Sequence, residues 1–253
     1  MNKKRQSNYR GLWCDKSWGL QRQRPFVAVR VRKGSKMRTL IISGGEIEKA
    51  FGGMVLKEEK WDYVIGVDGG VKFCYQEGIL PSRIVGDFDT LEEEILKWYR
   101  EHTQVEIRKF NPIKDATDTQ IAVELALQIG SKEIVILGGT GTRLDHVLGN
   151  IQTLYLALER GVDCQILDRH NRIRLIQDRY IIRRAKQYGT YFSLIPLTTE
   201  VKGVTLLGAK YPLHRHDFTV LGTGSLGVSN EIVEEEVEIR IESGVMILIE
   251  SRD

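Results

Sequence analysis

The chain has 253 residues, of which 42% are hydrophobic and 28% are charged, and this balance excludes a wholly disordered protein. Its three cysteines are too few and too widely spaced for a disulfide framework or a CxxC metal site. No apolar run reaches the ~18 residues that a membrane helix needs, and the N-terminus lacks the apolar stretch of a secretory signal. We therefore expect a cytoplasmic protein with no membrane contact and buried, unpaired cysteines.

Residues 1–36 form a basic segment with eleven Lys or Arg and one acidic residue, whereas the rest of the chain is net acidic because the total formal charge is +3. Basic arms often bind nucleic acid, but a protein that grips phosphate backbones rarely has an acidic body, so we expect no nucleic-acid partner. Met37 directly precedes a clean strand pattern. We interpret residues 1–36 as an extension that is disordered or not native, with the fold beginning at Met37.

Short apolar runs alternate with helical patterns from residue 37 to residue 168, which predicts an α/β domain with a mostly parallel sheet. Their interiors are apolar on both faces, as in strands covered by helices on each side. Six strands are expected within residues 38–45, 63–70, 83–90, 105–110, 133–139 and 163–168.

Helix starts are predicted by two capping boxes, at residues 90–93 and 117–120. A third helix is expected over residues 146–159, with Leu148 and Tyr155 among its buried side chains and Gly161 ending it.

Residues 169–253 change to short strands with turn residues between them, which predicts a small all-β domain. Its clearest part is a terminal hairpin, in which residues 237–241 and 245–249 alternate apolar side chains around a tight turn at Ser243 and Gly244.

Acidic residues fall just past the ends of the predicted parallel strands. Those ends share one edge of the sheet, where open α/β folds bind their ligands, so motifs far apart in sequence converge there. A single Asp after a strand is about as often a helix cap or a turn former, but the whole set indicates a functional cleft. The set is Asp68, Asp87, Asp89, Asp115, Asp118 and Asp145.

Asp87 and Asp89 are two residues apart, which on an extended segment places both carboxylates on one face while Phe88 turns to the core. Unpartnered carboxylates this crowded repel one another unless a cation or basic groups neutralise them. Oxygen ligands completed by water and phosphate favour Mg²⁺.

The same edge offers what a polyphosphate needs. Glycine-rich turns at residues 69–70 and 138–141 expose backbone N–H groups, and Lys114 and Arg143 add positive charge. Glycine-rich turns alone are weak evidence, since strand ends commonly need them. The chain lacks GxxxxGK[ST], and GGTGTRL fails GxGxxG at its last position, so a P-loop kinase and a dinucleotide dehydrogenase are not supported.

The motifs GDFDT, KDATDTQ and GGTGTRLDHVLGN, in this order and spacing, resemble the signatures of bacterial thiamine pyrophosphokinases. The resemblance covers residues 37–253. It implies an N-terminal α/β domain that binds ATP and Mg²⁺, and a C-terminal β-sandwich that helps to form the thiamine pocket across a homodimer interface.

Carried over by motif, the resemblance implies Mg²⁺- and phosphate-handling roles for Asp87, Asp89 and Asp118, with Asp68 and Asp115 close by. The nucleotide-side contacts that it implies are Lys114, Thr117, Gly139, Arg143, Asp145 and His146. The segment GVSNEI is similar to a GTSNEF-like segment of the family, which makes Ser229 and Asn230 candidates for holding the aminopyrimidine of thiamine. Alternatively, His146 is a structural residue at its helix start and Ser229 with Asn230 forms a turn.

The implied reaction is attack of the thiamine hydroxyl on the β-phosphorus of ATP, which releases AMP and transfers a pyrophosphoryl group in one step. Asp68 or Asp115 is the candidate proton acceptor, and the sequence does not choose between them. One alternative is a pyrophosphokinase of the same fold acting on another alcohol, such as a hydroxymethylpterin. Another is a non-catalytic nucleotide- or nucleic-acid-binding protein that uses the basic arm.

Overall fold

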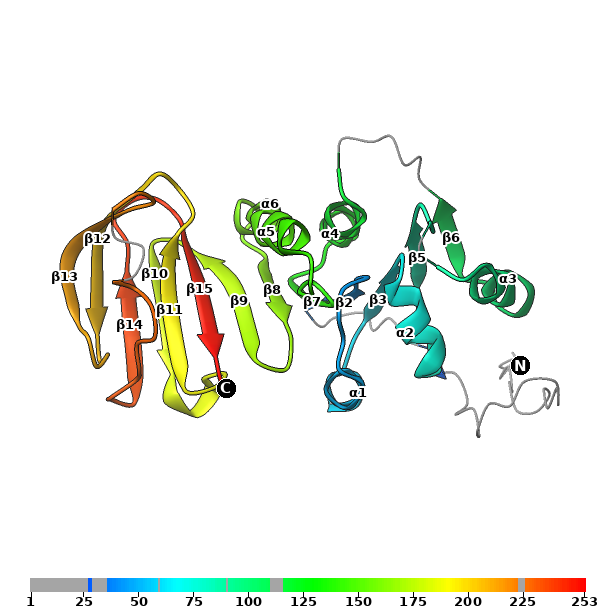
Figure 1. Ribbon diagram of the computed structural model, residues 1–253, viewed down its shortest axis with the longest axis horizontal. Helices are drawn as coiled ribbons and strands as arrows, with labels where there is room; N and C mark the ends of the chain where they lie inside the picture. The colour runs from blue at the N-terminus through cyan, green and yellow to red at the C-terminus, as the bar shows by residue number, and fades with distance from the viewer. Residues whose placement is uncertain (1–26, 29–35, 59, 90, 110–115, 223–225) are drawn as a thin grey trace, which may run out of the picture.

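The structure is a computed structural model that describes residues 27–28, 36–58, 60–89, 91–109, 116–222 and 226–253. Figure 1 shows an α/β part at one end and a β-sandwich at the other, with β8 and β9 between them. None of the helices in these ranges is long and apolar enough to cross a membrane.

All six predicted strands of the α/β part form, and they pair in parallel in the spatial order β8-β7-β2-β3-β5-β6. The strands are β2 (Arg38–Ile42), β3 (Tyr63–Val67), β5 (Arg83–Gly86), β6 (Glu106–Lys109), β7 (Glu133–Leu137) and β8 (Asp163–Leu167). The chain order reverses between β2 and β7, which makes their junction the topological switch point of the sheet. Both strands have fully buried interiors, as their two-sided apolar patterns predict.

Helices cover both faces of this sheet. They are α1 (Lys49–Glu58), α2 (Gly70–Gln76), α3 (Glu93–His102), α4 (Asp118–Gln128), α5 (Leu144–Thr153) and α6 (Tyr155–Leu158). Phe51 and Val55 of α1 pack on one face of β2 and β7, whereas α4, α5 and α6 pack on the other (Figure 1).

The helix predicted over residues 146–159 is broken into α5 and α6 at Leu154, and it begins earlier, at Leu144. Gly161 has φ +63 and follows the last turn, as predicted. The pattern predicts that Leu148 and Tyr155 are buried, and this is wrong. Their side chains are 61% and 39% exposed. The apolar stripe is therefore wider than the face that the sheet covers.

The two predicted capping boxes form only in part. Thr117 Oγ1 accepts a hydrogen bond from the Gln120 backbone N–H at 3.2 Å, which confirms this cap, but the Gln120 side chain bonds Glu124 instead of returning to Thr117. Helix α3 begins at Glu93 and has Glu92 at its N-cap position, without a side-chain cap; Thr90 lies outside the described residues.

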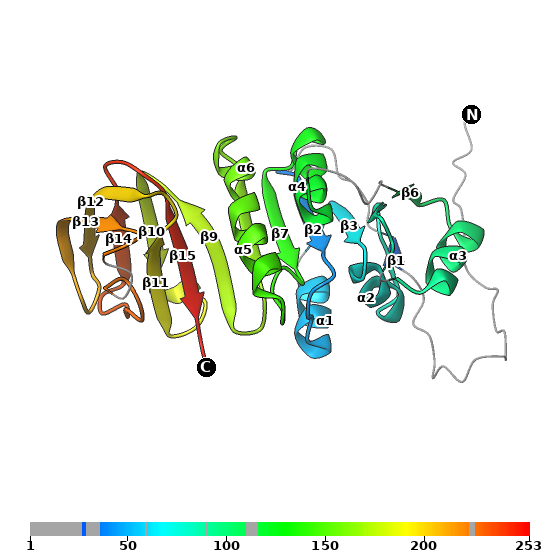
Figure 2. The same cartoon turned by 45° about the horizontal axis from the view of Figure 1, so that its top comes forward.

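The C-terminal part is built from seven strands in two layers. They are β9 (Asn171–Ile176), β10 (Arg179–Arg183), β11 (Tyr191–Pro196), β12 (Glu200–Leu207), β13 (Leu213–Thr219), β14 (Glu236–Arg240) and β15 (Met246–Ser251), with a 3₁₀ turn, η1 (Arg184–Lys186). Strands β10, β14, β12 and β13 form one sheet, and β9, β15 and β11 extend the large sheet to nine strands. Figure 2 shows β15 and β9 nearer to the helices than β12, β13 and β14. Phe192 and Phe218 are fully buried between the layers.

The predicted terminal hairpin is wrong. Strand β14 pairs with β10 and β12, whereas β15 pairs with β9 and β11, so the two strands lie in different sheets. The turn at Gly244, with φ +95, carries the chain across the sandwich. Val237 and Ile239 thus meet Met246 and Leu248 face to face in the shared core, instead of through backbone hydrogen bonds.

The predicted boundary between residues 168 and 169 falls in the turn between β8 and β9. These strands pair antiparallel, and Asp168 Oδ1 holds the turn by accepting from the backbone N–H groups of His170 and Asn171, each at 2.7 Å. One hydrogen-bonded sheet therefore runs through both parts, and the division into two domains stays a prediction.

Within the predicted N-terminal extension, β1 (Val27–Ala28) pairs in parallel with β4 (Ile79–Leu80). The other residues of 1–35 lie outside the described residues. Cys74 and Cys164 are free and buried, as predicted, and Cys14 is not described.

Candidate functional site

Three of the predicted aspartates meet at the carboxyl edge of the parallel strands. Asp68 follows β3, Asp87 follows β5, and Asp118 opens α4, which packs back over β2 and β3. One carboxylate oxygen from each residue lies within 4.8 Å of the other two. All three residues are partly buried. This arrangement is the convergence that the strand-end rule predicts.

The backbone around this acidic cluster (Asp68, Asp87 and Asp118) adopts left-handed conformations. Asp68 has φ +43 and Phe88 has φ +62, both uncommon for residues other than glycine. Asp68 Oδ1 accepts from the Phe88 N–H at 3.2 Å, and Asp87 Oδ1 accepts from the Asp89 N–H at 3.1 Å. Strained backbone of this kind is concentrated at functional sites.

The predicted extended arrangement of residues 87–89 is wrong, because left-handed Phe88 turns the chain between the two aspartates. Phe88 is buried, as predicted, at 9% exposed. Asp89 is exposed and lies outside the group of three carboxylates. Asp115 and Lys114 lie outside the described residues.

Gly86 makes room for Asp68. It has φ +152, and a Cβ atom built there lies 1.9 Å from Asp68 Oδ1. A Gly86→Ala variant is therefore expected to lose about 1–3 kcal/mol of unfolding free energy and to displace this carboxylate. Urea unfolding measures the first effect, and the Mg²⁺-dependent rise in melting temperature measures the second.

Gly149 is the matched control, because it lies in α5 and, apart from its chain neighbours and the backbone of its own helix, no atom of the described residues is within 4 Å of its Cβ position. Gly149→Ala is expected to stabilise the protein by about 0.5–1 kcal/mol. A Gly86→Ala variant with wild-type stability and an unchanged Mg²⁺ response contradicts the role given to this glycine.

The acidic cluster has the electrostatics of a cation site. Burial, followed by the neighbouring Asp118, raises the pKa of Asp68 to about 7, although the Phe88 N–H opposes part of this rise. Crowded carboxylates therefore disfavour full ionisation of the group, and a bound cation relieves that repulsion. The donor set consists of oxygens, which fits Mg²⁺.

The glycine turns after β2 and β7 pack against each other at the switch point of the sheet. Gly45 N donates to Gly138 O at 2.9 Å, and Glu46 N donates to Thr140 O at 3.0 Å. A Cβ atom on Gly45 lies 2.2 Å from Thr140 O, so only glycine permits this contact. Gly139 is held in place by α5, since its carbonyl accepts from the buried Asn150 side chain of that helix at 2.9 Å.

Of the two predicted glycines after β3, Gly70 has a packing role. Gly70 begins α2, and a Cβ atom there lies 2.1 Å from Ile42 O. Gly70 thus lets α2 pack closely on the end of β2.

The predicted nucleotide contacts at the start of α5 are on the open surface. Arg143 binds Asp145 through two hydrogen bonds, of 2.6 and 3.2 Å, and both side chains are well exposed. Hydrogen bonding from Arg143 and from the His146 N–H holds the pKa of Asp145 down at about 2. His146 is exposed in the first turn, and Thr117 is exposed at the N-cap of α4.

Ser229 and Asn230 lie in the β-sandwich. Ser229 is exposed with φ +58, and its N–H donates to Ser193 Oγ at 3.0 Å. Asn230 is only 5% exposed, and its amide holds Tyr211 by accepting from the Tyr211 N–H at 3.1 Å and donating to the Tyr211 carbonyl at 2.9 Å. The described geometry thus gives Asn230 a structural task.

Sequence reasoning missed several supporting residues. Ser43, at the end of β2, shares a buried hydrogen bond of 2.6 Å with Thr119 of α4, which anchors the helix start that carries Asp118. Thr140 Oγ1 donates to Asp168 Oδ2 at 2.9 Å and ties the glycine turn to the β8–β9 turn. The signal available for Ser43 was a polar residue directly after an apolar strand.

The fold and the site define a class of protein: an open α/β sheet with a candidate cation and phosphate site at its carboxyl edge, continued by a β-sandwich. The model of the family "Thiamin pyrophosphokinase, catalytic domain" matches residues 56–166. The model "Thiamin pyrophosphokinase, vitamin B1 binding domain" matches residues 179–246.

A thiamine pyrophosphokinase of Bacillus subtilis (strain 168) is 32% identical over 189 residues, which cover 75% of this chain and 87% of that protein. The chain therefore belongs to the thiamin pyrophosphokinase family, whose members are enzymes that transfer pyrophosphate from ATP to thiamine.

Solved structures of two relatives share the fold. A crystal structure of the Bacillus subtilis thiamine pyrophosphokinase has a TM-score of 0.75 and 30% identity, and covers 85% of this chain and 99% of that one. The thiamin pyrophosphokinase of Geobacillus thermodenitrificans has a TM-score of 0.74 and 28% identity, and covers 86% of this chain and 98% of that one.

Proposed function

We propose that this chain transfers a pyrophosphoryl group from ATP to the hydroxyethyl group of thiamine, giving thiamine diphosphate and AMP. Membership of the family supports the reaction. The observation that carries the proposal is the convergence of three carboxylates within 4.8 Å at the sheet edge, beside the glycine turns.

We propose Asp68, Asp87 and Asp118 as the residues that hold Mg²⁺. The role of Asp89 as a metal ligand stays a prediction. Its N–H donates to Asp87, and its side chain is exposed beside the group of three carboxylates. When bound, Mg²⁺ supplies positive charge against the polyphosphate. Asp68 or Asp115 is the proposed acceptor of the thiamine hydroxyl proton. Asp68 is among the described residues, and Asp115 is not.

The switch point between β2 and β7 is the proposed seat of the ATP phosphates. The turn at residues 138–141 lies there, where its Gly138 and Thr140 carbonyls accept from the Gly45 and Glu46 N–H groups, at a place where open α/β folds bind ligands. Its own backbone N–H groups are proposed to donate to the phosphates. Arg143, held by Asp145, together with His146, Thr117 and Lys114, is proposed to orient the nucleotide so that the alcohol attacks in line.

A homodimer with the thiamine site between subunits is also proposed. The bridge from Asn230 to β11 places GVSNEI in the sandwich, at the other end of the molecule from β3 and β5 (Figure 1). A thiamine held by Ser229 therefore reaches an acidic cluster only in a second chain. Leu221, Leu226 and Val228 near this segment are 97%, 51% and 46% exposed, which suits a covered surface.

The test of function is to incubate the purified chain with ATP, Mg²⁺ and thiamine, and to identify the products by chromatography and mass spectrometry. Equal amounts of AMP and thiamine diphosphate, formed only with both thiamine and Mg²⁺, are expected. AMP formed only with another alcohol, such as a hydroxymethylpterin, keeps the reaction and replaces the substrate. No turnover with any acceptor contradicts the proposal.

A deletion of residues 1–26 separates the enzyme from a nucleic-acid binder, and it keeps β1 in place. The deletion is expected to retain turnover.

Light scattering of the purified chain reports whether it is a dimer. A cytoplasmic location is proposed as well, since the free Cys74 and Cys164 thiols suit a reducing compartment, and cell fractionation tests it.

A further inference from the structure

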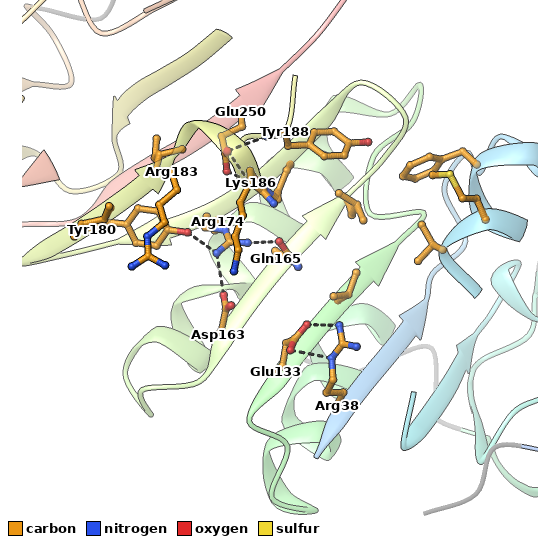
Figure 3. Close-up of a pocket in the computed structure, with 18 of the residues that line it drawn as sticks. Arg38, Glu133, Asp163, Gln165, Arg174, Tyr180, Arg183, Lys186, Tyr188 and Glu250 are labelled. Atoms are coloured by element: carbon orange, nitrogen blue, oxygen red, sulfur yellow. Dashed lines mark hydrogen bonds and ion pairs between the residues drawn. The ribbon is translucent and has the colours of Figure 1, made fainter. Parts of the chain in front are cut away.

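A cavity of about 690 Å³ lies on the α1 side of the sheet, away from the acidic cluster. It is walled by α1, β7 and β8 on one side and by β9, β10 and η1 on the other (Figure 3). Arg38, Glu133 and Asp163 in its wall are the first residues of β2, β7 and β8, whereas Asp68 and Asp87 of the acidic cluster directly follow the last residues of β3 and β5. Its volume is typical of sites for small organic ligands.

Among the described residues, five basic and three acidic side chains line this cavity. Two of the acids are already used: Glu133 binds Arg38 through hydrogen bonds of 2.9 and 2.6 Å, and the fully buried Glu250 binds Arg172 through hydrogen bonds of 2.7 and 2.6 Å. These pairs shape the walls. The remaining basic side chains of the lining, Arg174, Arg183 and Lys186, outnumber its remaining acid, Asp163. Arg183 also lies 3.8 Å from Glu236, outside the cavity, in a contact that is exposed to solvent.

Arg174 is the buried member of this basic wall, at 9% exposed. Its guanidinium donates to the Tyr180 hydroxyl at 2.6 Å and to Gln165, and it lies 3.4 Å from Asp163. Its Nε is buried and has no hydrogen-bond partner among the described residues. A buried, unsatisfied donor of a charged group is costly, which suits a site that receives an acceptor. Figure 3 shows Arg174, Arg183 and Lys186 across the cavity from Arg38 and Glu133.

Beside the Arg38–Glu133 pair, the opposite wall has an apolar part. Val135 and Leu167 of the sheet line it together with Met54 and Val55 of α1. Met54 is 41% exposed there, although it is a large apolar side chain. Methionine adapts its shape to apolar ligand surfaces. The cavity therefore sets an apolar surface against a surplus of positive charge.

We propose that this cavity is a second ligand site, which binds the phosphate monoester of a small apolar or aromatic alcohol. The phosphate lies against Arg174, Arg183 and Lys186, and its negative charge is opposite in sign to the excess of basic over acidic side chains in the lining. The organic group lies against Met54 and Leu167. None of these residues belongs to the proposed catalytic site, so the two proposals stand independently.

Phenyl phosphate is the probe, measured by isothermal titration calorimetry with thiamine and a non-hydrolysable ATP analogue filling the proposed catalytic site. One molecule is expected to bind per chain. The double variant Arg183→Ala/Lys186→Ala is expected to weaken binding at least about tenfold, because two charge-assisted contacts are lost. Its control, Lys97→Ala/Lys202→Ala, removes the same charge from side chains that are 69% and 57% exposed elsewhere, and is expected to bind normally.

A second pair of variants tests the apolar wall. Met54→Glu places a charged carboxylate in the apolar wall that receives the organic group and is expected to weaken binding, whereas Val233→Glu, at a side chain that is 54% exposed in the sandwich, is expected not to. Unchanged melting temperatures show that the variants fold.

Several outcomes overturn the proposal. Absence of binding to the wild-type chain does so, as do displacement of phenyl phosphate by the ATP analogue and unchanged affinity in the Arg183→Ala/Lys186→Ala variant. Inorganic phosphate bound as tightly as phenyl phosphate removes the role of the apolar wall. Benzoate bound as tightly as phenyl phosphate removes the preference for a dianion.

Discussion

An Asp87→Asn variant is expected to fold and to lose about 100- to 1,000-fold in turnover, since several kcal/mol of charge stabilisation depend on the metal that this carboxylate is proposed to hold. Removing one of three crowded carboxylates also relieves repulsion. The metal-free variant is therefore expected to gain about 0.5–2 kcal/mol of stability, and its melting temperature is expected to stop rising with Mg²⁺. Steady-state kinetics and thermal unfolding with and without Mg²⁺ measure these effects.

Glu94→Gln is the control for this variant, because it removes a charge from the exposed side of α3 and leaves the cluster intact. It is expected to behave as wild type. Near-normal turnover of Asp87→Asn contradicts the metal assignment. Asp89→Asn decides the remaining predicted ligand: a loss equal to that of Asp87→Asn keeps Asp89 in the set, and normal turnover removes it.

Glu250→Ala is expected to lower the unfolding free energy by about 3–5 kcal/mol, because it leaves a largely buried arginine without its partner. Glu250 is fully buried, and the Arg172 side chain is 20% exposed. Glu250 Oε1 also accepts from the Tyr188 N–H at 3.1 Å, so the substitution removes the acceptor of three N–H donors, two from Arg172 and one from Tyr188. Urea unfolding monitored by fluorescence measures the loss.

Glu250→Gln is expected to lose less than Glu250→Ala, because an amide oxygen still accepts from Arg172. Glu101→Ala is the surface control, since its contact with Lys97 is 3.9 Å long and exposed. If Glu250→Ala lowers the unfolding free energy by less than about 1 kcal/mol, the buried pair contributes no more than a surface ion pair, which contradicts this prediction.

The parallel strands could be predicted because their signals are local. Runs such as the one in β7 are apolar on both faces and end at Gly, Asp or Ser, and alternation with helices requires parallel pairing. The same local reasoning placed Asp68, Asp87 and Asp118 at one edge. Their meeting within 4.8 Å needed only the topology.

Pairing within the sandwich could not be predicted. The alternation of apolar and polar residues in β14 and β15 shows that each strand has one apolar face. It does not show whether the two strands pair by hydrogen bonds or face each other across a core. The left-handed backbone of Phe88 could likewise not be predicted from the sequence. A bulky residue takes φ +62 only when contacts such as the hydrogen bond from its N–H to Asp68 hold it there.

The antiparallel pairing of β8 with β9 limits how this enzyme can move. Gln165 lies opposite Arg174 in a ladder that crosses from the α/β part into the sandwich, so hinge-like closure of one part on the other has to break backbone hydrogen bonds. Domain closure is therefore a costly route to sequestering a substrate. Exclusion of water during the reaction falls instead to loops at the carboxyl edge and, in the proposed homodimer, to the neighbouring subunit.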